Sequence, residues 1–282
     1  MAIEIVLPSA KIVSVTVNPA ALLEMGARIC HKSESKGTPT LQFLRAILKK
    51  KHFGVFEHAS MSVVAVTSRA VSHELVRHRI ASYLQESQRY VPYDSAVPIL
   101  YSEALRTYIS YEDAKNIAEV LDAYATHLAT SDPYDLSLSK QKRGFVEDIE
   151  QAYLAANMPR HSIGGSILDK FFESYIVAAN NYAALRRFSV APEAARGILP
   201  NDAATKILVT MNLASWRHFL SVRAFDNTGR AAPDMHVLAD GILRAAIDYE
   251  DQSLHKLLLM EQETHRTPSD SGLSPLFNRE YY

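Results

Sequence analysis

The segment RHRIASYLQESQRY, residues 77–90, gathers side chains suited to binding an anion. Arg77, Arg79 and Arg89 carry planar guanidinium groups, which form paired hydrogen bonds with phosphate oxygens or with carbonyl-rich rings. Ser87 adds a hydroxyl, which we interpret as a hydrogen-bond donor because the sequence implies no histidine partner that would make it a nucleophile. The segment predicts an anion site, and a solvated arginine-rich turn is the alternative.

Two arginines from the second half of the chain are candidates to join this site after folding. With Arg196 and Arg223 included, the arginines outline a nucleotide pocket, although the spacing in APEAARGILP alone favours a helix-surface position for Arg196. The sequence contains neither a G-x-G-x-x-G fingerprint nor a Walker loop nor a nucleophile elbow. Any dinucleotide is therefore expected to be held in another way.

Cysteine and metal chemistry receive little support from the spacing. The single cysteine, Cys30, excludes an intrachain disulfide, and in GARICHK we interpret it as a buried structural thiol rather than a nucleophile. His73 and His78 are five residues apart, which on a helix separates the side chains by about 140° and prevents joint zinc binding. No metal site is expected.

Composition limits the kinds of partner. The chain has 282 residues, 48% hydrophobic and 22% charged, with a formal charge of −1, so a full core is possible and a nucleic acid polymer is not an expected partner. No apolar stretch approaches 18 residues, and the start MAIEIVLPSAKIVSVTV carries an acidic residue and a proline where a secretory signal has a basic start and an unbroken apolar run. A cytoplasmic protein without a membrane segment is expected.

Periodicity places strands early and helices late. Alternating apolar residues predict strands, and apolar residues at steps of three and four predict helices. The expected strands are 4–17 and 58–68; the expected helices are 19–31, 41–48, 69–79, 168–185, 202–223 and 237–260. The segment 77–90 then begins where a helix ends. This order favours an α+β fold, with no repeat or linker to divide residues 1–282 into separate domains.

The arginine segment resembles the signature of the flavin-dependent thymidylate synthases. Arg77-His78-Arg79, seven residues and then Ser87 match it, and GARICH, HFGVFEHAS, ARGILP and MNLASWRHFLSVR follow in the order of that family. The resemblance covers most of residues 14–90 and 194–240. It implies a small antiparallel sheet packed with long helices, a homotetramer with shared flavin sites, and here an expanded helical region at about 91–190.

The resemblance also implies an activity. Members methylate carbon 5 of the uracil ring of dUMP, using 5,10-methylenetetrahydrofolate as one-carbon donor and FADH2, regenerated by NADPH, as hydride source, without a cysteine nucleophile. Arg223 is then expected to be catalytic, stabilising negative charge at N3 of the pyrimidine.

The remaining site residues are carried over by position. The expected flavin contacts are His52, Gly54, Arg77, His78, Arg79, Gln85, Asn212 and His218. The expected nucleotide contacts are Glu74, Arg77, Gln85, Glu86, Ser87, Gln88, Arg89, Arg196 and Arg223.

Several positions depart from the family pattern near these ligands. Glu74 stands where most members have Gln, Leu84 where they have a polar residue, and Gly54 where a hydroxyl side chain commonly meets the flavin. These departures favour a specialised methylase that accepts UMP as well as dUMP, like a similar enzyme of polyoxin nucleoside-antibiotic biosynthesis. The alternatives are a housekeeping thymidylate synthase strict for dUMP and a non-catalytic homologue that binds flavin or nucleotide.

Overall fold

The computed structural model describes most of the chain in two compact units. The described residues are 2–30, 32–33, 40–93, 95–130, 138–226 and 231–261, with backbone alone for 127–130, 138–143 and 145. Unit 1 consists of Met1–Leu7, Ser68–Ala70 and Glu86–Thr205, and unit 2 of Pro8–Thr67, Val71–Gln85 and Lys206–Tyr282. The single domain expected over residues 1–282 stays a prediction.

Unit 2 contains a four-stranded sheet in the order β2-β3-β6-β4. Its strands are β2 (Ser9–Val15), β3 (Ser60–Ser68), β6 (Ala204–Asn212) and β4 (Ser82–Gln85). The pairs β2–β3 and β4–β6 are antiparallel. The central pair is antiparallel too, because Leu213 N donates to Ala59 O while the Ser62 and Thr210 hydroxyls meet further along, both at 2.8 Å. The expected small antiparallel sheet is therefore present.

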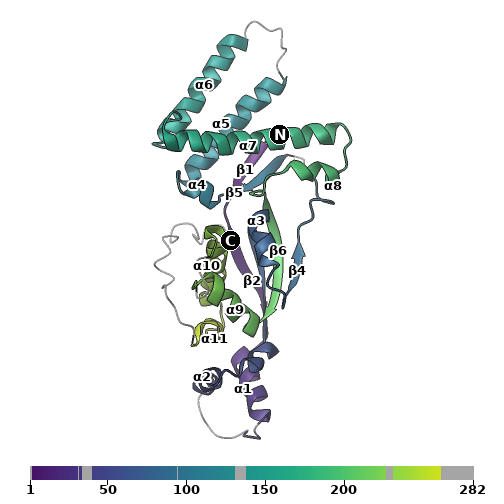
Figure 1. Ribbon diagram of the computed structural model, residues 1–282, viewed down its shortest axis with the longest axis vertical. Coiled ribbons are helices and arrows are strands. Elements are labelled where there is room, and N and C mark those ends of the chain that lie inside the picture. The colour runs from purple at the N-terminus through teal and green to yellow at the C-terminus, as the bar shows by residue number, and fades with distance from the viewer. Residues whose placement is uncertain are drawn as a thin grey trace. The chain divides into compact units, whose positions relative to one another are not determined.

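Helices make up the rest of the regular structure described in unit 2. They are α1 (Pro19–Ile29), α2 (Thr40–Lys49), the 3-10 helix η1 (Phe53–His58), α3 (Arg69–Leu75), α9 (Leu213–Arg223), α10 (Pro233–Ile247) and α11 (Ser253–Leu259). Figure 1 shows α9 and α10 beside the strands, and α10 packs against β2. Met61, Val63 and Ala65 alternate into the core, where they meet Trp216 of α9, as the period of two predicts.

One expected helix is partly a strand. Residues 202–223 were expected to be helical throughout, but 204–212 form β6 and only 213–223 form α9. In β6 the alternate residues Thr205, Ile207, Val209 and Met211 are buried, a period of two that the short run of apolar residues conceals. The change of structure falls at Asn212, whose side-chain oxygen accepts from Ser215 N at 2.8 Å and caps the helix.

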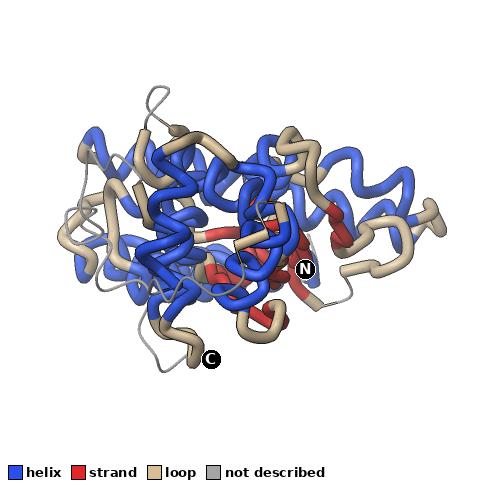
Figure 2. Tube along the Cα trace, turned by 90° about the horizontal axis from the view of Figure 1, so that it is seen from below, coloured by secondary structure: helices blue, strands red, loops and turns tan. Residues whose placement is uncertain are grey.

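Unit 1 contains two parallel strands, β1 (Ala2–Val6) and β5 (Ala96–Leu100), which pair with each other. Most of its other regular structure is helical. The helices are α4 (Glu103–Arg106), α5 (Tyr111–Thr130), α6 (Leu138–Ala155), α7 (Ile163–Arg187), α8 (Pro192–Ala195) and the 3-10 helix η2 (Arg196–Ile198). Helices make up most of the regular structure in the described residues (Figure 2). The amphipathic helix expected at 168–185 is confirmed as part of α7.

The start of α7 depends on two residues. Ser162 caps the helix by accepting a hydrogen bond from Gly165 N at 3.0 Å. A Cβ at Gly165 would lie 2.1 Å from the Pro159 carbonyl oxygen, so only glycine fits there. These contacts fix the start of the long helix α7, against which α5 and α8 pack.

Candidate active site

The Arg77-His78-Arg79 turn follows α3 directly, as expected from the sequence. Arg77 N donates to Glu74 O and His78 N to Leu75 O, both at 3.1 Å. The Tyr83 hydroxyl of β4 lies 2.9 Å from Leu75 O and 2.7 Å from His78 O. One phenol therefore contacts both the end of α3 and the turn that follows it. Burial raises the pKa of Tyr83 to about 12, which keeps the phenol a donor. The turn leaves Arg77 and Arg79 exposed to solvent.

His78 is the half-buried member of this turn. Its ring packs edge-on against Phe219 at 5.1 Å between centroids and lies 6.1 Å from His218. Burial, and then the charges of Arg223 and His218, lower the pKa of His78 to about 4. The imidazole is therefore neutral near pH 7, and its Nε2 accepts from Arg223 Nε at 3.4 Å.

Arg223 is the last residue of α9 and is held at both ends. Its Nη1 lies 3.6 Å from Glu74 Oε2, with side-chain exposures of 22% for Arg223 and 42% for Glu74. Its backbone carbonyl lies 2.9 Å from Nδ1 of His236 on α10. A fixed guanidinium between a carboxylate and a neutral imidazole is able to stabilise negative charge that develops on a bound ring.

The other flavin candidates lie on η1, α9 and β4 of the same unit. His52 precedes η1 and Gly54 lies within it, and both are exposed; a Cβ at Gly54 would meet no atom within 4 Å. His218 is exposed on α9, which packs against η1 and begins at the capping residue Asn212. Gln85 Nε2 donates to Ser72 Oγ at 2.9 Å. Exposed guanidinium and imidazole donors suit the phosphate oxygens of a flavin dinucleotide.

The nucleotide candidates of unit 1 form a second group. Arg89 Nε lies 3.1 Å from Glu193 Oε1, and Arg196 Nε donates to Glu193 O at 3.3 Å. Around them, Arg89 N donates to Ser87 Oγ at 3.3 Å, and the carbonyl of Glu86 accepts from Arg69 Nη2 at 2.7 Å. Arg89 is therefore paired with the carboxylate of Glu193, whereas Arg196 contacts only its backbone carbonyl. Gln88 is buried and donates to Tyr93 Oη at 3.2 Å.

The expected residues fall into two sets, one in each unit. The set in unit 2 contains Glu74, Arg77, His78, Arg79, Gln85, Asn212, His218 and Arg223, with His52 and Gly54 on the adjoining η1. The set in unit 1 contains Glu86, Ser87, Gln88, Arg89 and Arg196.

Sequence reasoning missed four residues that contact these groups. Tyr83 lies inside the signature, but nothing in its spacing indicates contact with two carbonyls. Glu193 pairs with Arg89 across more than a hundred positions of the sequence, so no local spacing indicates that contact. His236 and Asp240 are four apart on one helix face, which also indicates a pair.

The expectation that the Cys30 thiol is buried is wrong. The thiol is exposed rather than buried, with its Sγ 3.7 Å from Gly26 O. The buried face of α1 runs through Leu23 and Ala27, and the helix ends at Ile29, so Cys30 lies beyond the last turn that faces the core.

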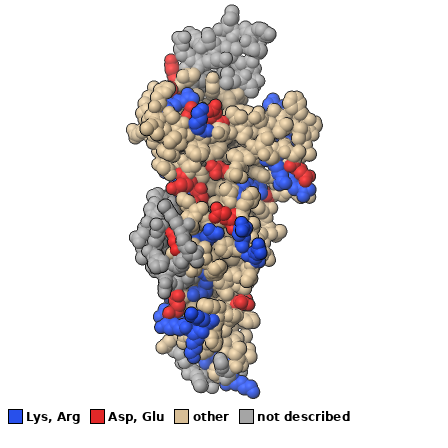
Figure 3. Space-filling view, viewed as in Figure 1, with Lys and Arg blue, Asp and Glu red and all other residues tan. Residues whose placement is uncertain are grey.

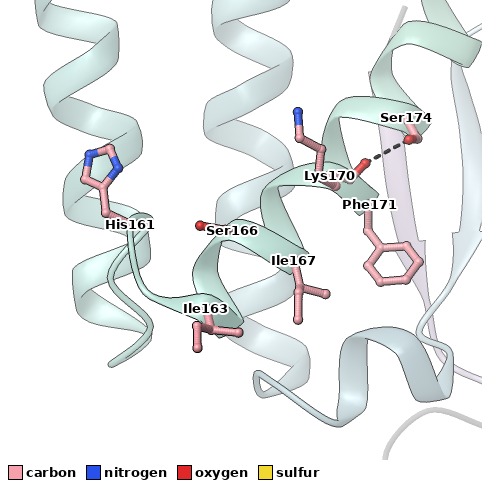
Figure 4. Close-up of a pocket in the computed structure, with 7 residues that line it drawn as sticks. All are labelled: His161, Ile163, Ser166, Ile167, Lys170, Phe171 and Ser174. Carbon is pink, nitrogen blue, oxygen red and sulfur yellow. Dashed lines mark hydrogen bonds between the residues drawn. The ribbon is translucent and has the colours of Figure 1, made fainter.

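A groove of about 610 Å³ lies along the first half of α7. Figure 4 shows Ile163, Ile167 and Phe171 on successive turns, with Lys170 and Ser174 beside them. The Ser174 hydroxyl donates to the Lys170 carbonyl at 2.8 Å, an ordinary contact within a helix. None of the residues that line the groove is among the predicted ligands.

Charge on the surface is mixed. Figure 3 shows small groups of both signs on the face in view, in keeping with the formal charge of −1. Among the described helices, none has the length and apolarity needed to cross a membrane.

Comparison with known proteins identifies the family. The model of Thy1, described as thymidylate synthase complementing protein, matches residues 11–248. The flavin-dependent thymidylate synthase of Mycobacterium marinum is 35% identical over 213 residues, which cover 73% of this chain and 68% of the relative. The flavin-dependent thymidylate synthase of Mycobacterium leprae (strain Br4923) is 32% identical over 234 residues, covering 81% and 76%.

A solved structure supports the same fold. The UMP/dUMP methylase PolB from Streptomyces cacaoi, bound with 5-Br dUMP, superposes with a TM-score of 0.61 at 19% identity, over 91% of this chain and 95% of that chain. The expected α+β fold of this family is confirmed. With a family model matched over most of its length and relatives above 30% identity, the chain belongs to the flavin-dependent thymidylate synthase family and is an enzyme of the methyltransferase type.

Proposed function

We propose that this enzyme methylates carbon 5 of the uracil ring in a uridine monophosphate, and that it accepts both UMP and dUMP. The observation that carries the proposal is Arg223, held between the carboxylate of Glu74 and the neutral imidazole of His78. FAD, reduced with NADPH, supplies the hydride when bound, and 5,10-methylenetetrahydrofolate supplies the one-carbon unit. Every other step falls to side chains of this chain.

Binding of the flavin is assigned to the exposed donors of unit 2. Arg77, Arg79, His52 and His218 are exposed and present donors for phosphate and ring oxygens, while Tyr83 fixes the turn that carries the two arginines. Gly54 leaves open space beside η1 where a larger side chain would occupy volume. The chemistry of these donors fits a flavin dinucleotide without a glycine-rich phosphate loop.

Activation of the pyrimidine is assigned to Arg223. As the ring is activated so that carbon 5 can donate an electron pair to the one-carbon unit, negative charge develops at N3, and a guanidinium that keeps its proton stabilises it. Because the pKa of His78 lies at about 4, that imidazole accepts from Arg223 rather than repelling it at neutral pH. The result is a guanidinium whose position is set before the nucleotide binds.

The nucleotide phosphate is assigned to the arginines of unit 1. Arg89 pairs with the carboxylate of Glu193, Arg196 contacts the backbone carbonyl of the same residue, and Ser87 supplies a hydroxyl beside Arg89. A phosphate carries more charge than a carboxylate and forms paired hydrogen bonds with a guanidinium, so it competes well with the Glu193 carboxylate for Arg89. Gln85, Glu86 and Gln88 complete the proposed nucleotide contacts.

The acceptance of UMP rests on the expected tolerance of the pocket for one hydroxyl. PolB, of similar fold, is a UMP/dUMP methylase. A pocket that tolerates an added hydroxyl discriminates against it by about a hundredfold or less. The test is kcat/KM for UMP and dUMP under identical folate and reductant. A preference for dUMP above about a thousandfold would identify a strict thymidylate synthase, which is the second candidate.

The role of Arg223 has its own test. Arg223→Ala should lower turnover by about a hundredfold, since one contact to developing charge is worth about 3 kcal/mol, while the protein retains its flavin. Arg187→Ala, an exposed arginine at the end of α7, serves as the matched control and should turn over normally. Unchanged turnover in Arg223→Ala would move the role to another residue.

We also propose that the enzyme is a cytoplasmic homotetramer that carries FAD as purified. Light scattering with size-exclusion chromatography gives the mass, and visible absorbance gives the flavin content. A colourless monomer that FAD does not reconstitute would contradict the assembly and the cofactor together.

A further inference from the structure

The carbonyl end of Arg223 is held from α10 by a histidine outside the expected site. Nδ1 of His236 lies 2.9 Å from the Arg223 carbonyl oxygen. A carbonyl only accepts, so Nδ1 carries the proton in this contact. On the other side of the ring, Nε2 of His236 lies 3.7 Å from the carboxylate of Asp240, which is only 4% exposed.

This contact falls where a helix lacks internal donors. The last four carbonyls of a helix have no partner within it, and the end of the helix dipole favours a positive or donating group there. α9 ends at Arg223, and Asp226 already adopts φ 54°, so the chain leaves the helix within three residues. His236 therefore fixes the backbone of Arg223 at the point where α9 stops.

The guanidinium at the other end depends on that anchor. A long arginine side chain loses about 2 kcal/mol of rotamer freedom when it is fixed, and its contacts with Glu74 and His78, at 3.6 and 3.4 Å, are individually weak. Loss of the backbone anchor would leave the side chain to these two weak contacts alone. The position of the guanidinium therefore depends on the fixed backbone as well as on Glu74 and His78.

We propose that His236 is a positioning residue that fixes Arg223 for the methylation reaction. The inference rests on the proposed function of Arg223. His236 does not touch the substrate in this scheme; it acts through the carbonyl of Arg223. A plain helix cap is the competing explanation, and it predicts loss of stability without a specific loss of turnover.

The experiment compares His236→Ala and His236→Asn in the full enzyme, each in the wild-type and the Arg223→Ala background. Asn places an amide donor near the position of Nδ1 and should preserve the contact. We expect His236→Ala to lower kcat about tenfold, the factor for one hydrogen bond of about 1.4 kcal/mol, with KM for dUMP and bound FAD little changed. His236→Asn should stay within about threefold of wild type.

The Arg223→Ala background separates positioning from a general effect. If His236 acts through Arg223, then His236→Ala causes no further loss of single-turnover rate once the guanidinium is gone. The proposal is overturned if His236→Ala lowers the single-turnover rate by the same factor in both backgrounds. It is also overturned if His236→Ala keeps the wild-type kcat. His161→Ala, an exposed histidine of unit 1, is the matched control. Should His236→Ala fail to fold, His236→Gln, with its amide displaced from the carbonyl, replaces it.

A structural measurement distinguishes failure of this proposal from failure of the proposed function. If the wild-type enzyme methylates neither nucleotide, the function is wrong, and crystal structures of the two variants still decide the positioning role. Arg223 should leave Glu74 and His78 in His236→Ala and keep both contacts in His236→Asn. An unmoved guanidinium in His236→Ala overturns the proposal.

Discussion

Replacing Glu74 with Gln removes a charge from Arg223 while keeping an acceptor beside it. In the structure Glu74 Oε2 lies 3.6 Å from Arg223 Nη1. The amide oxygen of Gln is also able to accept from the guanidinium, so its direction should be kept. Arg223 then presents more of its positive charge to an anionic nucleotide, and we expect KM for the nucleotide to fall while kcat changes little.

The distance and exposure set the size of this effect. Unit charges at 3.6 Å interact by about 1.2 kcal/mol in water and about 4.6 kcal/mol at an effective dielectric constant of 20. Because 42% of the Glu74 side chain is exposed, the smaller figure applies, and measured pairs of this kind contribute about 1 kcal/mol or less. KM should therefore fall by about two- to fivefold, and less at high salt.

The assay measures steady-state turnover of UMP and dUMP at low and high ionic strength. Glu119→Gln, an exposed carboxylate of α5, is the matched control. The charge argument requires a parallel fall for both nucleotides. A rise in KM for both would refute it, and a loss confined to UMP would instead assign the Glu74 carboxylate to the 2′-hydroxyl of the ribose.

Three further changes test other contacts. Arg217→Met removes a buried guanidinium that donates to the carbonyls of Leu257, Leu258 and Met260, and urea denaturation should show a loss of about 2–4 kcal/mol in the free energy of unfolding. His78, with a pKa lowered from 6.5 to about 4, binds more protons unfolded than folded, so stability should fall as pH drops through that window, and less steeply in His78→Asn. Cys30→Ser should keep full turnover, because the thiol is exposed at the end of α1.

Each of these has an outcome that contradicts it. A loss below about 0.5 kcal/mol in Arg217→Met, equal to that of the exposed control Arg187→Met, would show that the carbonyls find other donors. A pH dependence identical in wild type and His78→Asn would place the titrating group elsewhere. A folded but inactive Cys30→Ser enzyme would restore a covalent thiol mechanism.

Local patterns predicted much of the fold. The alternation in 58–68 gave β3, and the three-four spacing in 168–185 gave part of α7, because in both segments one face meets the core and the other does not. The same reasoning misassigned 204–212, since a short apolar run is compatible with either structure until its neighbours are known. β6 is a strand because β3 and β4 flank it.

The candidate site shows the same limit. The Arg77-His78-Arg79 turn was recognisable from residue types and spacing, and its place after α3 was expected. The contacts that give it chemical character come from distant parts of the chain: Arg223 meets His78 across 145 positions. No periodicity within a segment reports which of five arginines will lie beside a neutral imidazole. The lowered pKa of His78 follows from burial that only the fold creates.

The order of strands in unit 2 has a consequence for synthesis of the protein on the ribosome. β3 lies beside β6, and the Ser62–Thr210 contact between them spans 148 positions. At about 5–20 residues per second, β3 waits about 7–30 s for that neighbour to be made. During this interval Met61, Val63 and Ala65 lack the strand and the helix α9 that later cover them. A nascent chain in this state exposes apolar surface that favours aggregation, so soluble yield should vary with the speed of translation.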